Sequence, residues 1–330
     1  NKKVIGTFQL LKQKFSWNGE YKLYSENLDK VLKTGTGSNA DLNFIFIGML
    51  KSFGIKAYPV VMSRRSAGML PVSFPSLQKL NTFVVAIYDE VKGKYVYLDG
   101  SMDIPALNVL PVELSVTKAR ILSADIPENK KWVNLQEIPT NQIFMKISAN
   151  AQGSQITGRR TTILKGHDAL GYRKEYQTKD SLVNKQELVK EKLAISNLKR
   201  TEMEDDFATI QEDFDFILEA EKSEDHIYIN PMLFPQLTKN PFIQSERILP
   251  VEFPYLYRLN LSCALTLPEG YEVEEIPHSQ VVKTEDGKLQ CKYMIQRNGN
   301  NVIVNYSFSL NSSVMPSEYY SCLLYTSPSP

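Results

Sequence analysis

In the first hundred positions the apolar residues recur first at helical spacing and then in strand-like runs. This pattern predicts helices followed by strands. From Val4 to Phe15 the apolar residues recur at helical spacing, at positions 4, 5, 8, 11 and 15. A short apolar group at 28–32 predicts a second helix, and a glycine-rich turn at 34–37 separates it from a third helix that ends near Phe53. The third helix is apolar on nearly all sides, which predicts that it lies within a core.

Three strands are expected next, at 57–62, 82–88 and 94–98, because these runs are rich in β-branched and aromatic residues. A loop at 63–79 separates the first two strands. Loops of that length without regular structure are usually functional or mobile.

From about residue 125 onward the chain is rich in strand patterns. A helix is expected at 168–176, and the segment 182–199 carries mixed helix and strand signals. Turns that contain glycine separate the later strands at the spacing of a β-sandwich. The expected strands are 142–156, 161–164, 259–267, 281–282, 289–296 and 302–310.

Composition and charge narrow the function classes. The chain has 330 residues, of which 42% are hydrophobic and 23% charged, and a net charge of +1. This is the composition of a globular protein. It contains no basic run, so we expect no nucleic-acid partner. No apolar stretch approaches the ~20 residues of a membrane-spanning helix, so no transmembrane segment is expected. The absence of an initiating Met indicates that the chain begins inside a longer protein.

Cysteine and histidine are scarce, and they are absent from the N-terminal part. Their spacing fits neither a disulfide scaffold nor a metal site, so no metal or cofactor is expected. Cys263 and Cys291 lie in expected strands, where we interpret them as unpaired, with a disulfide between them as the alternative. The histidines are interpreted as ordinary surface or hydrogen-bonded side chains. The residues concerned are Cys263, Cys291, Cys322, His167, His226 and His278.

Three short motifs occur at informative places in the predicted elements. Gly37–Asp41 opens the buried helix, Leu80–Thr82 precedes the second strand, and Tyr97–Asp99 ends the third. In this order they resemble the catalytic positions of the transglutaminase-like, papain-type superfamily, and most of all a bacterial group with flanking β-rich domains of unknown function. Later segments resemble the C-terminal β domain of that group, at 227–231, 240–242, 247–251 and 268–271.

The resemblance implies a catalytic triad whose first two members are substituted here. The family places a cysteine at the helix start, a histidine at the start of a following strand and an aspartate at the end of the strand after it. This chain has Asn39, then Thr82 (or Asn81 if the register slips by one), and Asp99. A carboxamide neither ionises nor attacks a carbonyl, and neither Thr82 nor Asn81 exchanges a proton near neutral pH as imidazole does. We therefore expect a catalytically inactive protein.

Each of four residues near these motif positions has two alternative interpretations. Ser38 is interpreted as the helix cap, with a hydroxyl nucleophile as the alternative. Asp41 either contributes a carboxylate to a cleft or interacts favourably with the helix dipole. Trp17 either lines the cleft or packs in the core. Arg64 either binds a ligand carboxylate or pairs with a nearby acid.

The resemblance implies an α+β protein, with a papain/transglutaminase-like N-terminal domain at 1–124 that is incomplete at its start. A β-rich, sandwich-like region at 125–320 follows. Residues 321–330 resemble translated read-through at the end of a metagenomic fragment and are expected to be non-native.

The expected function is a peptide- or protein-binding or scaffolding component of the bacterial envelope or periplasm. Residual hydrolysis or amide transfer by other groups, such as Asp41 with Asp99, is the alternative. In a third reading the cleft is irrelevant and the protein is purely structural. An open crevice at Asn39, Thr82, Asp99 and Trp17 would favour ligand binding, whereas a filled crevice would favour a structural role.

Overall fold

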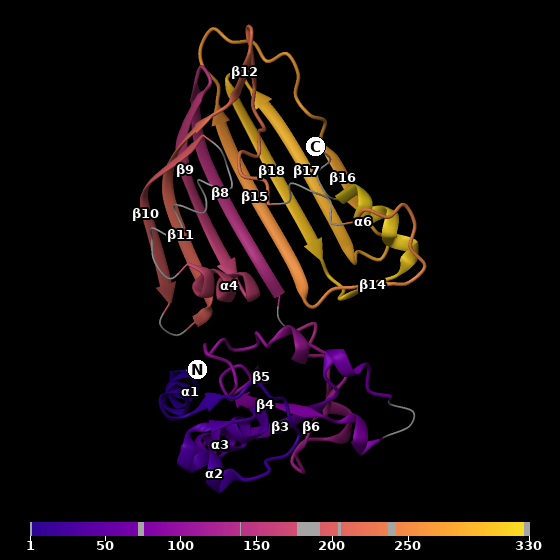
Figure 1. Ribbon diagram of the computed structural model, residues 1–330. Helices are drawn as coiled ribbons and strands as arrows, with labels where there is room; N and C mark the ends of the chain where they lie inside the picture. Colours follow the sequence, from indigo (N-terminus) through magenta and orange to yellow (C-terminus); the bar gives the residue numbers. More distant parts are fainter. Residues whose placement is uncertain are drawn as a thin grey trace. The chain divides into compact units, whose positions relative to one another are not determined.

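The computed structural model describes residues 2–71, 76–138, 140–176, 192–203, 206–236 and 242–326. Two compact units make up the chain (Figure 1). The first comprises Asn1–Pro139 together with Met203–Ala208, and the second comprises Thr140–Glu202 together with Thr209–Pro330. None of the helices in the described ranges is long and apolar enough to cross a membrane.

Three helices open the first unit, close to the expected bounds: α1 (Lys2–Lys14), α2 (Leu28–Thr34) and α3 (Asn39–Ser52). The side chain of Asn27 caps α2 by accepting a hydrogen bond from the Lys30 N–H, and Gly35 ends that helix in the left-handed conformation (φ 72°). The chain can then turn back toward α3.

The first unit is built on a five-stranded sheet in the order β5-β4-β3-β6-β7. Every neighbouring pair in it is antiparallel. A parallel two-stranded pair, β1 with β2, joins the chain before α2 to the chain before α3. Short 3-10 helices cover Arg65–Ala67, Leu77–Lys79, Val112–Leu114 and Glu128–Lys130. The strands are β1 (Ser16–Trp17), β2 (Thr36–Gly37), β3 (Ala57–Met62), β4 (Thr82–Asp89), β5 (Lys94–Leu98), β6 (Ala119–Ile121) and β7 (Trp132–Val133).

β4 is apolar along its length because both of its faces are buried. Phe83 and Val85 belong to the core that contains α1 and α3, whereas Val84 and Ala86 belong to a second core with Leu114. Successive side chains of a strand point to opposite faces, so a strand between two cores shows no polar alternation. β4 therefore holds its first residue, Thr82, in the interior.

An eight-stranded sheet forms the second unit, in the order β10-β11-β9-β8-β15-β18-β17-β16 (Figure 1). β8 and β15 run parallel, and the other neighbours with a described register are antiparallel. Its strands are β8 (Thr140–Gln152), β9 (Gln155–Lys165), β10 (Leu193–Met203), β11 (Asp206–Glu219), β15 (Leu256–Thr266), β16 (Gln280–Lys283), β17 (Leu289–Asn298) and β18 (Asn301–Leu310).

Smaller elements complete the second unit. The final helix packs its buried Leu323 against a core that includes Leu289 and Met315. The smaller elements are α4 (His167–Glu175), β12 (Glu221–Ser223), β13 (His226–Tyr228), β14 (Val251–Glu252), β19 (Val314–Met315), the 3-10 helix Ser317–Tyr319 and α6 (Tyr320–Thr326).

One buried ion pair lies inside the second unit. Arg160 of β9 pairs with Glu212 of β11, and the hydroxyl of Tyr172 donates to the other Glu212 oxygen at 2.5 Å. The Arg160 guanidinium also lies 4.2 Å from the centre of the Phe214 ring. These contacts compensate for the removal of two charges from water.

The predicted fold class is wrong. We expected an α+β protein with a papain-type domain followed by a separate, sandwich-like β region, but the chain is mostly β, with several sheets. The two units are not consecutive, because Met203–Ala208 belongs to the first. A single wide sheet dominates the second unit, so the strand spacing that suggested two packed sheets arose from neighbouring strands of one sheet.

Two sequence-based bounds differ from the structure for local reasons. The expected strand 142–156 is a hairpin, β8 with β9, in which Gly153 takes φ +59° at the turn. The expected boundary at residue 124 falls between β6 and β7, which pair with each other in the sheet of the first unit. Most of the ambiguous segment 182–199 lies outside the described residues, and its end belongs to β10.

Candidate functional site

The start of α3 is fixed by a reciprocal cap. The Ser38 hydroxyl accepts from the Asp41 N–H at 3.3 Å, while an Asp41 carboxylate oxygen accepts from the Ser38 N–H at 2.8 Å. The same oxygen also accepts from the Ser38 hydroxyl at 2.7 Å. A capping box of this kind satisfies backbone N–H groups that the first helical turn leaves without partners. Ser38 and Asp41 are therefore engaged with each other.

Asn39, the first residue of α3, is completely buried and all of its polar groups are used. Its backbone N–H donates to the Glu20 carbonyl at 3.0 Å, and its side-chain oxygen accepts from the Lys22 N–H at 2.7 Å. Its amide nitrogen donates to the Thr82 hydroxyl oxygen at 2.7 Å and to the Phe83 carbonyl at 3.2 Å. Asn39 thus joins α3 to β4 and to the segment before α2.

Asn43 continues this network one helical turn later. Its amide nitrogen donates to the Phe83 carbonyl at 2.8 Å and to an Asp99 oxygen at 2.9 Å. Its side-chain oxygen accepts from the Gly100 N–H at 2.6 Å. Gly100 suits this position because an added Cβ would meet the Asn43 oxygen at 3.1 Å and the Leu42 backbone at 3.2 Å.

Asp99 follows β5 and is fully buried. Ser101 donates its hydroxyl to one Asp99 oxygen, and its N–H lies 3.4 Å from the other. Burial raises the pKa of the Asp99 carboxyl above its usual value, and the hydrogen bonds from Ser101 and Asn43 oppose that rise. Desolvation is the stronger effect, so the folded state favours the protonated form more than the unfolded chain does.

The structure therefore brings Asn39 into direct contact with Thr82, and Asn43 links this pair to Asp99. Sequence reasoning missed Asn43 and Ser101. The available signal was spacing, because residues 39 and 43 are four apart and share one face of a helix.

The remaining candidates lie on the segment and loop beside this network. The Trp17 indole N–H donates to the Glu20 carbonyl at 2.9 Å, and its ring centre lies 4.9 Å from that of Tyr21. Trp17 thus helps to hold the Glu20 carbonyl that accepts the Asn39 N–H. Burial is the main effect that raises the pKa of Tyr21 to about 12.

Arg64 has protein partners. Its guanidinium lies 5.5 Å from the centre of the Tyr21 ring and 4.0 Å from a Glu113 oxygen. Asn81 accepts from the Arg64 N–H at 2.9 Å and donates its own N–H to the Met62 carbonyl at 3.1 Å. Asn81 therefore holds the loop after β3, whereas the neighbouring Thr82 contacts Asn39 directly.

The histidines and cysteines lie in the second unit. His167 stacks on Tyr255 with ring centres 4.4 Å apart, and burial lowers its pKa to about 4. Cys263, Cys291 and Cys322, all of them among the described residues, form no disulfide bond. Among the described residues, no group of three or more His, Cys, Asp or Glu side chains is arranged to hold a metal ion.

Comparisons with known proteins place this geometry in context. Residues 225–324 match the family described as "Domain of Unknown Function with solved-structure structure (DUF3858)". The crystal structure of a "putative protease" from Parabacteroides distasonis ATCC 8503 has a similar fold, with a TM-score of 0.51 and 15% sequence identity. The match covers 98% of this chain and 48% of that one, so the chain spans about half the length of that protein. No curated protein matches significantly.

Proposed function

We propose that this chain is a non-catalytic relative of the transglutaminase-like enzymes. In this proposal Asn39, Thr82 and Asp99 occupy the positions of a lost triad and now stabilise the interior. The observation that carries the proposal is the complete engagement of Asn39, whose backbone and side-chain groups bond to Glu20, Lys22, Thr82 and Phe83. The fold shared with a protein described as a protease is compatible with this ancestry.

The chemistry of these groups supports inactivity. A nucleophile needs an ionisable group or a base that removes its proton, and an amide nitrogen that donates two hydrogen bonds meets neither condition. No histidine precedes His167 and no cysteine precedes Cys263 in the sequence, so the first 139 residues contain neither. The Asn39 N–H would be suited to an oxyanion, but it donates to the Glu20 carbonyl at 3.0 Å.

The alternative function, hydrolysis by the carboxylates Asp41 and Asp99, has less support. Two carboxylates divide acid and base roles when they share a substrate site that separates their pKa values. Here Asp41 bonds to Ser38 in the helix cap, whereas Asp99 bonds to Asn43 and Ser101. At most 6% of either aspartate is exposed.

Because the network is buried, a non-catalytic role in which its side chains do not contact a partner is favoured. Asn39, Thr82 and Asp99 are each 0% exposed, so a peptide gripped directly by these three side chains would first have to open the interior. We therefore propose a scaffolding or binding role in which partners contact other surfaces. A location in the bacterial envelope belongs to the same proposal and is supported by the resemblance to that bacterial group.

The proposal is tested with the unmodified chain in two assays. One measures hydrolysis of fluorogenic peptide amides, and the other measures incorporation of a fluorescent primary amine into glutamine-containing protein. We expect no turnover above that of Asn39→Ala and Asp99→Asn variants in either assay. Turnover by the unmodified chain that both substitutions abolish would show that these positions are catalytic and would overturn the proposal.

A further inference from the structure

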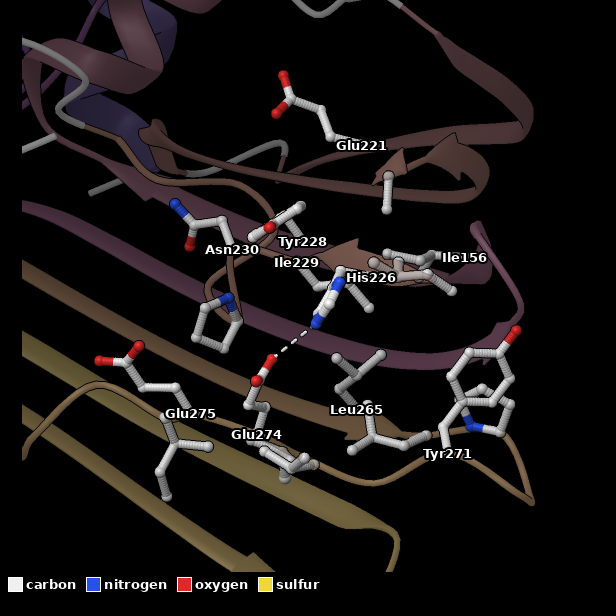
Figure 2. A pocket seen from close by; sticks show the side chains of 18 of the residues that line it. Ile156, Glu221, His226, Tyr228, Ile229, Asn230, Leu265, Tyr271, Glu274 and Glu275 are labelled. Carbon is white, nitrogen blue, oxygen red and sulfur yellow. Dashed lines mark ion pairs between the residues drawn. The ribbon is translucent and has the colours of Figure 1, made fainter. Parts of the chain in front are cut away.

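A cavity of about 940 Å³ opens at one end of the large sheet in the second unit, far along the sequence from the buried network. Its floor is formed by buried aliphatic side chains from five strands: Ile156, Leu218, Leu265, Ile295 and Val302. Figure 2 shows the segment from His226 to Asn230 on one side of this floor and the segment with Tyr271, Glu274 and Glu275 on the other. The volume lies within the range of about 300 to 1,000 Å³ typical of ligand sites.

The sides of the cavity are strongly acidic. Glu274 faces His226, with 3.1 Å between the Oε2 and Nε2 atoms, and the two form an ion pair when the histidine is protonated (Figure 2). Among the residues that line the cavity, all of them described, there is no lysine or arginine. Its six acidic side chains are Glu219, Glu221, Asp225, Glu272, Glu274 and Glu275. An apolar floor below a rim of one charge sign suits a ligand that carries both aliphatic groups and positive charge.

Two exposed tyrosines add to this preference. Tyr228 is 60% exposed and Tyr271 is 46% exposed, and both line the cavity. Aromatic rings attract ammonium and guanidinium groups through their π faces, and the attraction adds to that of nearby carboxylates. A basic side chain is therefore favoured over a simple apolar ligand.

The backbone along one side of the cavity favours a peptide over a small cation as the ligand. Residues 271–277 all line the cavity and form no helix or strand. Within the described ranges, no backbone–backbone hydrogen bond involves any of these seven consecutive residues. Residues 271–276 each carry a backbone N–H and C=O, and Pro277 adds only a C=O. Backbone groups of this kind in a row are what an extended peptide pairs with when it adds to an edge.

We propose that this cavity binds an extended basic peptide segment of a partner protein. Its backbone pairs with residues 271–277, its lysine or arginine side chains face the acidic rim, and its aliphatic side chains enter the floor above Leu265. This binding site is independent of the proposed loss of catalysis, because none of its residues belongs to the network around Asn39.

The test uses the full chain and fluorescent six-residue peptides in anisotropy titrations. The probe alternates leucine and lysine, which places the basic side chains on one face of an extended strand and the apolar ones on the other. Two control peptides replace leucine with serine or lysine with glutamate. We expect saturable binding of the leucine–lysine peptide, at least about tenfold weaker binding of both controls, and weaker binding as salt rises from about 50 to about 300 mM.

Matched charge variants locate the site on the protein. Glu272→Gln with Glu275→Gln removes two carboxylates from the rim and leaves the His226–Glu274 pair intact. Glu246→Gln with Glu285→Gln changes the net charge equally at exposed positions that do not line the cavity. We expect the rim variant to weaken binding by roughly two- to thirtyfold, because exposed ion pairs contribute modestly, and the control variant to leave the Kd unchanged.

Three results would overturn the proposal. Equal binding of the serine–lysine peptide would mean that the apolar floor is not used. An equal loss of affinity in the Glu246/Glu285 variant would indicate attraction to overall charge. No saturable binding at about 1 mM protein would exclude a specific peptide site, since a Kd of about 1 mM corresponds to a binding free energy of only about 4 kcal/mol.

Discussion

Removal of the Asn43 side chain is the sharpest structural test of the buried network. Asn43→Ala leaves the Gly100 N–H without its acceptor and removes one donor from Asp99. The Phe83 carbonyl keeps a bond from Asn39 at 3.2 Å, so it is not fully orphaned. The substitution therefore leaves the Gly100 N–H without a partner, removes one hydrogen bond from Asp99 and creates one small cavity.

The magnitude follows from these losses. A buried N–H without a partner costs about 1 to 3 kcal/mol, and the lost bond to Asp99 and the void add to this. The expected decrease in the free energy of unfolding is about 3 to 5 kcal/mol, a large share of the stability of an ordinary domain. As a control, Gln9→Ala on the exposed side of α1 should change the free energy of unfolding by less than about 0.5 kcal/mol.

The assay is urea unfolding followed by tryptophan fluorescence. Both tryptophans, Trp17 and Trp132, lie in the first unit, so this signal reports the unit that contains Asn43. The transition midpoint should fall markedly in Asn43→Ala and stay in place in Gln9→Ala. A loss below about 1 kcal/mol in Asn43→Ala would refute the claim that the network stabilises this unit.

Two further predictions concern buried charges. Burial raises the pKa of Asp99 above its usual 3.8, so the folded state binds this proton more tightly and the contribution of Asp99 to stability falls as pH rises from 3.8 through the folded pKa. The unfolding free energy of Asp99→Asn minus that of the parent should rise with pH across this window in urea titrations, and a constant difference would contradict the assignment. In the second unit, Arg160→Met should lose about 3 to 5 kcal/mol because Glu212 stays buried without its partner, whereas Arg160→Met with Glu212→Leu should lose less. Urea unfolding followed by circular dichroism measures the free energy of unfolding of the single and the double variant. Equal losses of stability in the two variants would contradict the explanation.

Much of the first unit was predictable because its local patterns agree with its tertiary contacts. The α3 helix is apolar nearly all round and is indeed largely buried, and the Ser38 cap was expected from the residue type. The pairing of Asn39 with Thr82 followed from a resemblance to the order of motifs, since no local rule specifies a contact between residues 43 positions apart.

The second unit shows where local patterns fail. Strands of one wide sheet and strands of two packed sheets have the same alternation and the same turns, so the sequence did not separate them. The apolar floor of the cavity was visible only as strand positions such as Leu265 and Val302, and the acidic segments that flank it come from elsewhere in the sequence. Tertiary pairing, which brings Leu265 opposite Val302, determines that these residues meet.

The accessibility of position 39 tests the central claim most directly. In Asn39→Cys the new thiol is alkylated with iodoacetamide in native buffer and in urea, and labelling is read from the peptide that contains position 39. The thiol in Gln9→Cys serves as the exposed reference. We expect position 39 to be labelled at least about a hundredfold more slowly than position 9 in the native protein and equally fast in urea. Native labelling of position 39 at the rate of the exposed reference would show an open site and contradict the account.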